Sequence, residues 1–164
     1  MPYTTKDIVK QHILDHHLGS TLIENEPVQL SANDAVSLQR RMILKGSEKV
    51  KGKEQLEPTE ETVSFTGSDT FGLSHPELIP DTVVVAGDSS LGTVYLENID
   101  YHIDYDAGEI KRIDSGSLTE GATVVIWYLH YRIYQRGEDY DIDYQKGTIR
   151  RRSSGNIESG QRAL

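Results

Sequence analysis

An internal repeat constrains the fold of this chain more than any other feature. The segment 100–121 (DYHIDYDAGEIKRIDSGSLTEG) aligns without gaps with 139–160 (DYDIDYQKGTIRRRSSGNIESG), and 11 of the 22 aligned positions are identical. Each copy reads as an alternating stretch, a turn closed by glycine, a second alternating stretch, then Ser-Gly and another turn, which is typical of antiparallel β-structure. The sequence therefore predicts a duplicated strand-turn-strand unit.

A weaker match lies upstream, where residues 26–50 align with 61–85 and five of the 25 positions are identical. The two matches divide the chain into four related segments. The first two, 26–50 and 61–85, are here called the front segments, and the last two, 100–121 and 139–160, the rear segments. The second front and the first rear are contiguous and predict one β-module over 61–130. The first front (24–60) and the second rear (131–164) predict an outer module into which the first is inserted, because the ends of a domain often lie close together. The predicted fold is mainly β, with two small antiparallel β-sandwich-like modules, one nested in the other.

Residues 1–23 predict an N-terminal helix and a linker. Thr4 or Thr5 can cap a helix that runs to about His17, before Gly19. One face of this helix is apolar and needs a partner, either the rest of the chain or a neighbouring chain. The apolar stripe consists of Ile8, Val9, Ile13 and Leu14.

Three other stretches carry expectations about the sheets. Residues 45–61 are polar and charged, which predicts a linker or exposed loop. Residues 123–131 (TVVIWYLHY) are the most apolar and predict a central strand. The second repeat is followed only by 161–164 (QRAL), so its closing strand is expected to be absent or very short. This predicts an open sheet edge that can pair with another chain, unless the last strand is simply short.

Composition excludes several classes of function. With 17 basic and 26 acidic residues the net charge is −9, which argues against a sequence-specific nucleic-acid-binding protein. There is no cysteine, so disulfides and thiolate metal sites are excluded. No apolar run is long enough for a membrane span, and the N-terminus lacks the apolar centre of a signal peptide. We expect a cytoplasmic protein, or a component of a particle assembled there.

Two groups of residues suggest ligands, each with a structural alternative. Asp139, Asp141 and Asp143 alternate along a predicted strand and share one face, where three carboxylates could bind calcium. Duplication favours an acidic face with turn-forming aspartates. Trp127 and the many tyrosines could form a sugar-stacking platform, although aromatics in strands more often pack across the sheet.

No catalytic motif is present. His12 and His16 lie four residues apart on the predicted helix, but the glutamate of the zinc-protease pattern is missing. His75 lies in a turn without a nucleophile motif beside it. We therefore predict a protein that is not an enzyme, with no catalytic, cofactor-binding or metal-binding residues.

Charge is distributed unevenly along the chain. Arg150, Arg151, Arg152 and Arg162 make the last third basic, whereas 97–109 is acidic. A protein that is acidic on one module and basic on the other can pair with copies of itself. The predicted interface therefore consists of these arginines, the C-terminal Leu164 and the apolar stripe of the N-terminal helix.

The run ETVSFTG at 61–67, followed by Leu73-Ser-His, Ile79-Pro-Asp-Thr-Val-Val-Val and the repeated Asp-Tyr-x-Ile-Asp-Tyr motif, resembles the small immunoglobulin-like β-sandwich modules of tailed-bacteriophage virion proteins. The resemblance covers about 26–164 and is clearest over 61–164. With its helical N-terminus, the chain looks like a neck protein, that is, a head–tail connector of the adaptor or collar type.

The resemblance implies a structural protein of the virion that forms a homo-oligomeric ring between portal and tail. It also implies portal, tail and neck proteins as partners, and assembly in the host cytoplasm. The alternative is a carbohydrate-binding or calcium-dependent adhesion module of a tail fibre or secreted protein.

Overall fold

The computed structural model describes residues 22–31, 34–52 and 57–164. The described part is mainly β, as predicted, with several antiparallel sheets and no helix. The predicted N-terminal helix lies outside the described residues. Of the predicted helix and linker over 1–23, only residues 22 and 23 of the linker are described. The strands are β1 (Val28–Leu30), β2 (Val36–Ser37), β3 (Val50–Gly52), β4 (Thr59–Ser64), β5 (Thr70–Gly72), β6 (Val84–Ala86), β7 (Val94–Tyr95), β8 (Tyr101–Asp104), β9 (Glu109–Arg112), β10 (Thr123–Tyr128), β11 (Arg132–Tyr134), β12 (Tyr140–Asp143), β13 (Thr148–Arg151) and β14 (Gln161–Ala163).

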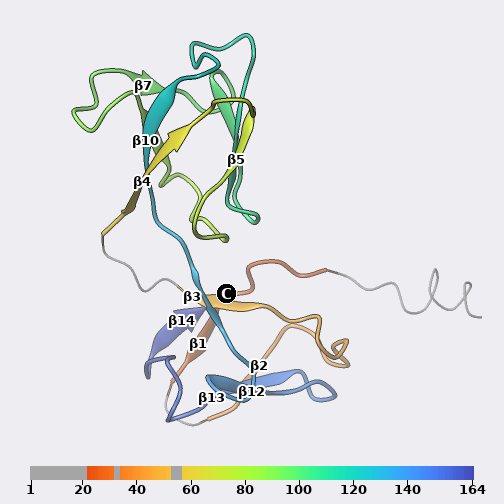
Figure 1. The fold of residues 1–164 in the computed structure, drawn as a ribbon. Helices are drawn as coiled ribbons and strands as arrows, with labels where there is room; N and C mark the ends of the chain where they lie inside the picture. The colour runs from red at the N-terminus through yellow and green to blue at the C-terminus, as the bar shows by residue number, and fades with distance from the viewer. Residues whose placement is uncertain (1–21, 32–33, 53–56) are drawn as a thin grey trace, which may run out of the picture.

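The strands from β4 to β10, here called the central segment, form two sheets with the orders β4-β10-β6-β7 and β5-β9-β8 (Figure 1). The predicted central strand is confirmed, because β10 pairs with β4 on one side and with β6 on the other. Alternation along β10 turns Val124, Ile126 and Tyr128 inward, and all three are fully buried.

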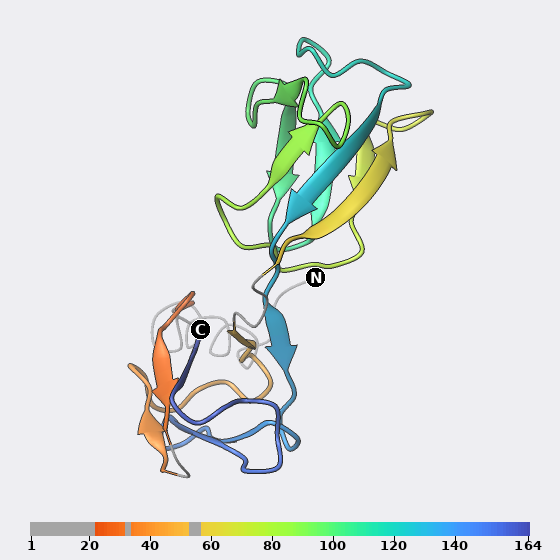
Figure 2. The same ribbon diagram turned by 90° about the vertical axis from the view of Figure 1, so that its left-hand side faces the viewer.

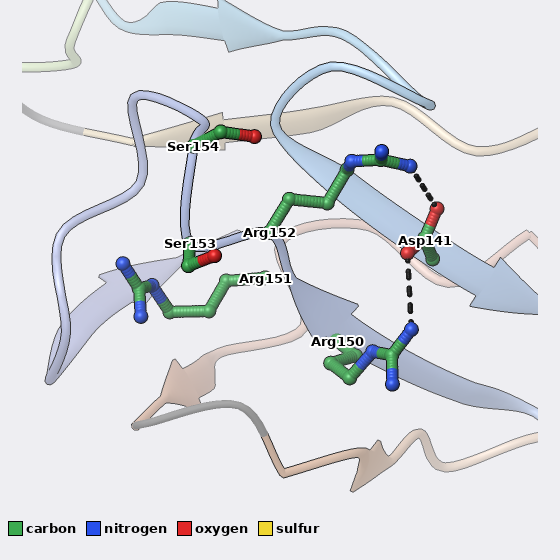
Figure 3. A pocket seen from close by; sticks show the side chains of 6 residues that line it. All are labelled: Asp141, Arg150, Arg151, Arg152, Ser153 and Ser154. Carbon is green, nitrogen blue, oxygen red and sulfur yellow. Dashed lines mark hydrogen bonds and ion pairs between the residues drawn. The ribbon is translucent and has the colours of Figure 1, made fainter.

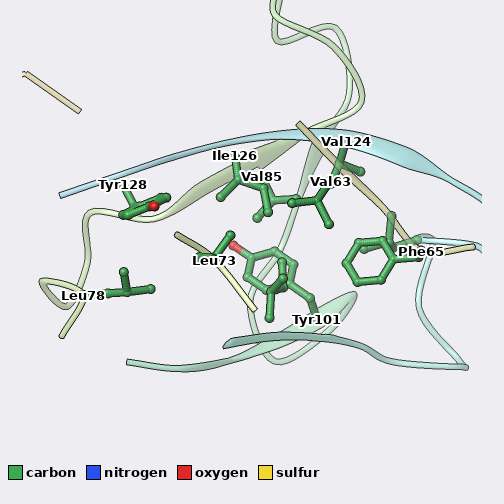
Figure 4. Packing of buried hydrophobic residues seen from close by; sticks show 11 residues of the cluster. Val63, Phe65, Leu73, Leu78, Val85, Tyr101, Val124, Ile126 and Tyr128 are labelled. Atoms are coloured by element: carbon green, nitrogen blue, oxygen red, sulfur yellow. The ribbon is translucent and has the colours of Figure 1, made fainter. Parts of the chain in front are cut away.

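The core of the central segment lies between its two sheets (Figure 4). Burial of these aliphatic and aromatic side chains supplies most of the driving force for folding in this part of the chain. Its buried members are Val63, Phe65, Leu73, Leu78, Val85, Tyr101, Ile110, Leu118, Val124, Ile126 and Tyr128.

The strands on either side of the central segment, here called the flanking strands, pair with one another across the insertion. β1 pairs with β14, β3 with β11, and β2 joins β13 and β12 in a three-stranded sheet. Figures 1 and 2 show them as a second group of strands at one end of the central segment. They enclose a core of their own, formed by Val28, Leu30, Val50, Tyr134, Tyr140, Ile149, Ile157 and Ala163.

Both internal repeats have a counterpart in the strand pairing. The pair Val124↔Val63 corresponds to Ala163↔Val28, at the offsets of 39 and 35 found in the sequence. The β10–β6 pairing has its counterpart at Leu164, which exchanges backbone hydrogen bonds of 2.8 and 3.0 Å with Lys51. The last strand is very short, as expected, but the edge at 161–164 is not open: β14 pairs with β1, and Leu164, directly after β14, is hydrogen-bonded to Lys51 of β3.

The linker predicted over 45–61 is wrong at 50–52, which form β3, and at 59–61, which begin β4, whereas 45–49 contain no strand. The prediction failed because the charged residues of this stretch made it look like an exposed loop, whereas they alternate along a strand with residues that face the core. Val50 is buried, whereas Lys49 and Lys51 on either side of it face away from the core.

Two glycines of the repeat are required by close backbone contacts. Gly147 has a φ of +64°, and a Cβ at this position would collide with the carbonyl oxygen of Arg40. Gly108, its counterpart, would collide with the carbonyl oxygen of His75 at a φ of +67°. Gly108 thus lets the turn between β8 and β9 pack on the loop that contains His75. Gly147 lets the turn between β12 and β13 pack on the loop that contains Arg40.

We predict that Gly147→Ala lowers the free energy of unfolding more than Gly137→Ala does. Gly137 also has a positive φ, of +84°, but nothing lies within 4 Å of its added Cβ. Backbone strain alone costs about 1–2 kcal/mol, and overpacking at Gly147 adds about 1–3 kcal/mol. Urea denaturation of both variants measures the difference, and equal losses would contradict the close packing.

Candidate functional site

Three consecutive arginines line a surface depression of about 410 Å³ at the end of β13 (Figure 3). Asp141 contributes from the neighbouring strand β12, and two serines contribute from the turn that follows β13. The lining residues are Asp141, Arg150, Arg151, Arg152, Ser153 and Ser154.

Asp141 organises this depression through two ion pairs. Its carboxylate accepts hydrogen bonds from Arg150 at 3.2 Å and from Arg152 at 3.0 Å. Burial opposes ionisation of Asp141, but the two guanidinium groups outweigh burial and hold its pKa below the ordinary value. Arg151 donates through Nε to the carbonyl oxygen of Ile157 at 2.8 Å.

Three guanidinium groups and one carboxylate line the depression, which therefore has an excess of positive charge. Guanidinium groups and serine hydroxyls are the donors that bind carboxylates and other oxyanions. Two of the arginines are about half exposed, which leaves donor hydrogens available to solvent. The arrangement can bind an anionic surface or ligand.

The remaining described interface candidates lie at a second depression, also of about 410 Å³. It is lined by Gly52, Tyr131, Gln161, Arg162 and Leu164. The structure therefore divides the five candidates between two places on the flanking strands. Ile8, Val9, Ile13 and Leu14 lie outside the described residues.

The repeated aspartates are engaged in turns rather than gathered around a cation. Asp100 accepts backbone hydrogen bonds from Leu96 and Ser117, and these bonds lower its pKa. Asp139 does the same with Gln135 and Asn156. Among residues 22–31, 34–52 and 57–164, no group of three potential ligands is placed to hold a metal ion.

Four tyrosines belong to the cores. Tyr101 and Tyr128 are buried in the central segment, and Tyr134 and Tyr140 are buried among the flanking strands. The indole nitrogen of Trp127 donates to Glu60 at 2.9 Å on the outer face of the central sheet. These positions are those of cross-strand packing rather than of a shared stacking platform.

A histidine–tyrosine cluster that the sequence did not reveal lies at the end of β10. The rings of His75 and His130 stack with centroids 3.9 Å apart, and His75 Nδ1 lies 3.2 Å from the hydroxyl of Tyr128. That hydroxyl also donates to Glu61. Burial, and then this hydrogen bond, raises the pKa of Tyr128, so the phenol stays protonated. Burial lowers the pKa of His130.

A buried carboxylate joins the central segment to the flanking strands. Glu77, only 2 % exposed, lies in the loop between β5 and β6 and accepts hydrogen bonds from Lys49 and from Lys51, the latter at 2.8 Å. Its carbonyl oxygen accepts a hydrogen bond from the backbone of Tyr131 at 2.7 Å. The ammonium group of Lys51 also lies 5.0 Å from the ring centroid of Tyr131.

The ionisation of Glu77 depends on this contact. Burial by itself favours the neutral acid, but the hydrogen bonds from Lys49 and Lys51 outweigh burial and lower the pKa of Glu77. The hydrogen bond to Glu77 raises the pKa of Lys49 in turn. The sequence around position 77 does not distinguish this glutamate from exposed ones. The one available signal is that the equivalent position in the other copy, at the offset of 35, is Met42 and not a glutamate.

Comparison of the chain with known protein families, characterised proteins and solved structures finds no match. In the part of the chain that the structure describes, no helix has the length and apolar character needed to cross a membrane. The proposals below therefore rest on the residues and geometry given above.

We predict that Glu77→Gln lowers the free energy of unfolding by about 1–3 kcal/mol at neutral pH, because two lysines lose their ionic partner. The stabilisation from a carboxylate with a lowered pKa is present at neutral pH and is lost as the pH falls through that pKa. The acid-side decline in stability should therefore be shallower in Glu77→Gln than in the parent protein.

Urea titrations between pH 7 and pH 3 measure both effects. Glu109→Gln is the matched control, because it removes one negative charge from an exposed position. A Glu77→Gln variant with unchanged stability and an unchanged acid slope would contradict the assigned role of the junction.

Proposed function

We propose that this chain is a structural subunit of a tailed-bacteriophage particle, a head–tail connector or neck protein that forms a homo-oligomeric ring between portal and tail. In this proposal the strands make two small antiparallel β-sandwich-like modules, with residues 61–130 inserted into an outer module of 24–60 and 131–164. The subunit catalyses no reaction. Its work is to form repeated contacts with copies of itself and with portal and tail proteins in a particle assembled in the host cytoplasm.

The observation that carries this proposal is the difference in charge between the two copies of the repeat. Residues 97–121 contain two basic and seven acidic residues, so 2 − 7 gives −5. The equivalent residues 136–160 contain five of each, so 5 − 5 gives 0. Both copies keep the same strands and turns, and their surfaces diverge around them.

The divergence is concentrated on exposed positions around the second strand of each repeat. Asp106, Glu109, Asp114 and Glu120 are exposed, and uncharged residues occupy the four equivalent positions of the second copy. Ala107, Ile113 and Thr123 have basic equivalents, namely Lys146, Arg152 and Arg162. The first copy is thus strongly acidic, whereas the second is neutral overall but gathers basic side chains at Arg150–Arg152. An acidic surface and a local basic patch on one chain support association between copies, because opposite charges orient the encounter and disfavour other arrangements.

The resemblance of the Asp-Tyr-x-Ile-Asp-Tyr units to phage virion modules supports the particular setting. A ring under load needs large, repeated contacts between identical subunits, and heterologous contacts between two different faces generate rings when the rotation closes. The basic depression at Arg150–Arg152 offers one such face to an acidic partner surface.

Mass photometry and sedimentation velocity of the whole chain test the proposal. The expected result is a closed oligomer, formed alone or on addition of the portal and tail proteins encoded alongside it. A chain that stays monomeric with both partners present would overturn the proposal. Binding of glycans by the monomer would favour the adhesion alternative instead.

We predict that Arg150→Glu weakens assembly and that Lys111→Glu has little effect. The two residues occupy equivalent positions of the repeat and both are exposed, so the variants change the same charge on the two modules. Reversal at Arg150 removes a donor from the basic depression and repels an acidic partner. Assembly constants from sedimentation at 50 and 300 mM salt measure the effect, which should shrink at the higher salt because of screening. Equal effects of the two variants would argue against this face.

A further inference from the structure

Two loops of the chain are structural equivalents, although they present different side chains. The backbone of Leu78 donates to Tyr105 at 2.7 Å, and the backbone of Ile43 donates to Tyr144 at 2.8 Å. These are the same hydrogen bond in the two copies of the repeat. The residues before them, Glu77 and Met42, have φ values of +57° and +56°, a conformation that is uncommon for residues other than glycine.

The loop of the central segment already shows what such a loop can contact. Through Glu77 it lies against the outer face of β3, where Lys49 and Lys51 bind the carboxylate. This is an intramolecular contact between one copy of the fold and a loop of the other. The corresponding loop of the flanking strands, 40–45, is held on the β12–β13 turn by backbone hydrogen bonds from Met42 to Gln145 and from Ile43 to Tyr144.

Loop 40–45 carries apolar side chains that the described part of the chain leaves exposed. Met42 is 78 % exposed and Leu44 is 70 % exposed. Basic residues surround them, because Arg40, Arg41 and Lys45 are exposed as well. The loop therefore presents an apolar tip within a basic rim.

The residue equivalent to Lys49, which directly precedes β3, is Val84 on β6, at the offset of 35. Val85 and Tyr95 pair with each other and face the core, so Val84 and Val94 lie on the outer face of the sheet. Val84 is 39 % exposed and Val94 is 49 % exposed, and Leu96 follows at 56 %.

Acidic residues surround this apolar face of β6 and β7. Asp81 and Asp88 lie in the turns before and after β6, and both are exposed. Glu97, which follows Leu96, is not part of this acidic rim, because its carboxylate accepts a hydrogen bond from Tyr105 at 2.7 Å. The face therefore has the complementary pattern to loop 40–45: an apolar centre within an acidic rim.

We infer that loop 40–45 of one copy docks on the β6–β7 face of the next copy, with Met42 and Leu44 against Val84, Val94 and Leu96. The contact corresponds to the one that Glu77 and Lys49 make within one chain, with Met42 and Val84 at the equivalent positions; Ala86, the equivalent of Lys51, is buried. It rests on the proposed self-association and names the surfaces that perform it. Because two different faces meet, the contact is heterologous and propagates from copy to copy.

Single-cysteine variants test the contact directly, since the chain contains no cysteine of its own. Under mild oxidation, a mixture of Met42→Cys and Val94→Cys should form a disulfide-linked dimer between the two variants. The double variant should form a ladder of linked copies. Ile133→Cys replaces Val94→Cys as the control, because Ile133 is the equivalent residue of the flanking strands and is 38 % exposed. It should not cross-link to Met42→Cys.

Association constants provide a second measurement. Met42→Glu and Val84→Glu should each weaken self-association at least about tenfold, as expected for an apolar contact at the centre of an interface. Leu22→Glu changes an exposed leucine elsewhere and should leave association unchanged. Unchanged unfolding midpoints for all three variants verify that they are folded.

The outcomes separate this inference from the proposed function. Specific cross-linking together with weakened association supports the contact. Oligomers that form normally in both glutamate variants, without the cross-link, overturn the contact and leave the connector proposal standing. A chain that is monomeric with and without portal and tail proteins overturns both.

Discussion

Hydrogen bonding between remote segments is the interaction on which the flanking strands depend. Leu30 pairs with Gln161 at a separation of 161 − 30 = 131 residues, and neither β1 nor β14 has more than three residues. Closing a loop of this length costs entropy before any contact between its ends forms. The central segment reduces that cost, because β4 begins and β10 ends at the paired residues Thr59 and Tyr128. Once the central segment is folded, it therefore brings the two remote segments together.

Equivalent positions in the two copies of the repeat fall into two groups. Some carry the same residue and maintain the backbone structure, and others differ in chemistry between the copies. Asp100 and Asp139 accept backbone hydrogen bonds in the same way, and Gly108 and Gly147 admit the same loop contact. Glu77 and Met42 share a backbone conformation but not a chemistry. One of them joins the two groups of strands, and the other is exposed. Function in such a duplicated fold is expected where equivalent positions differ.

The sequence predicted the β-class, the central position of 123–128 and the turn role of the repeated aspartates, because repeats and alternation are local patterns. It failed where local composition and tertiary placement disagree. Lys49 and Lys51 made 45–61 look like a linker, although Val50 between them is buried. The Glu77 junction and the stacked pair of His75 and His130 were not predicted, because both depend on contacts between segments that are remote in sequence. The three arginines were selected from the sequence as interface residues because they are consecutive, but the depression that they line was not predicted.

The register of the terminal strands determines how the chain responds to tension. Val28 pairs with Ala163, so the residues before β1 and after β14 leave the ladder at the same end. A force that pulls these two ends apart opens the ladder one pair at a time, as in a zipper, and never loads all its hydrogen bonds together. The same holds for the central segment, where Thr59 lies opposite Tyr128. The β1–β14 and β4–β10 ladders are therefore expected to separate at low force when the chain is pulled at these points.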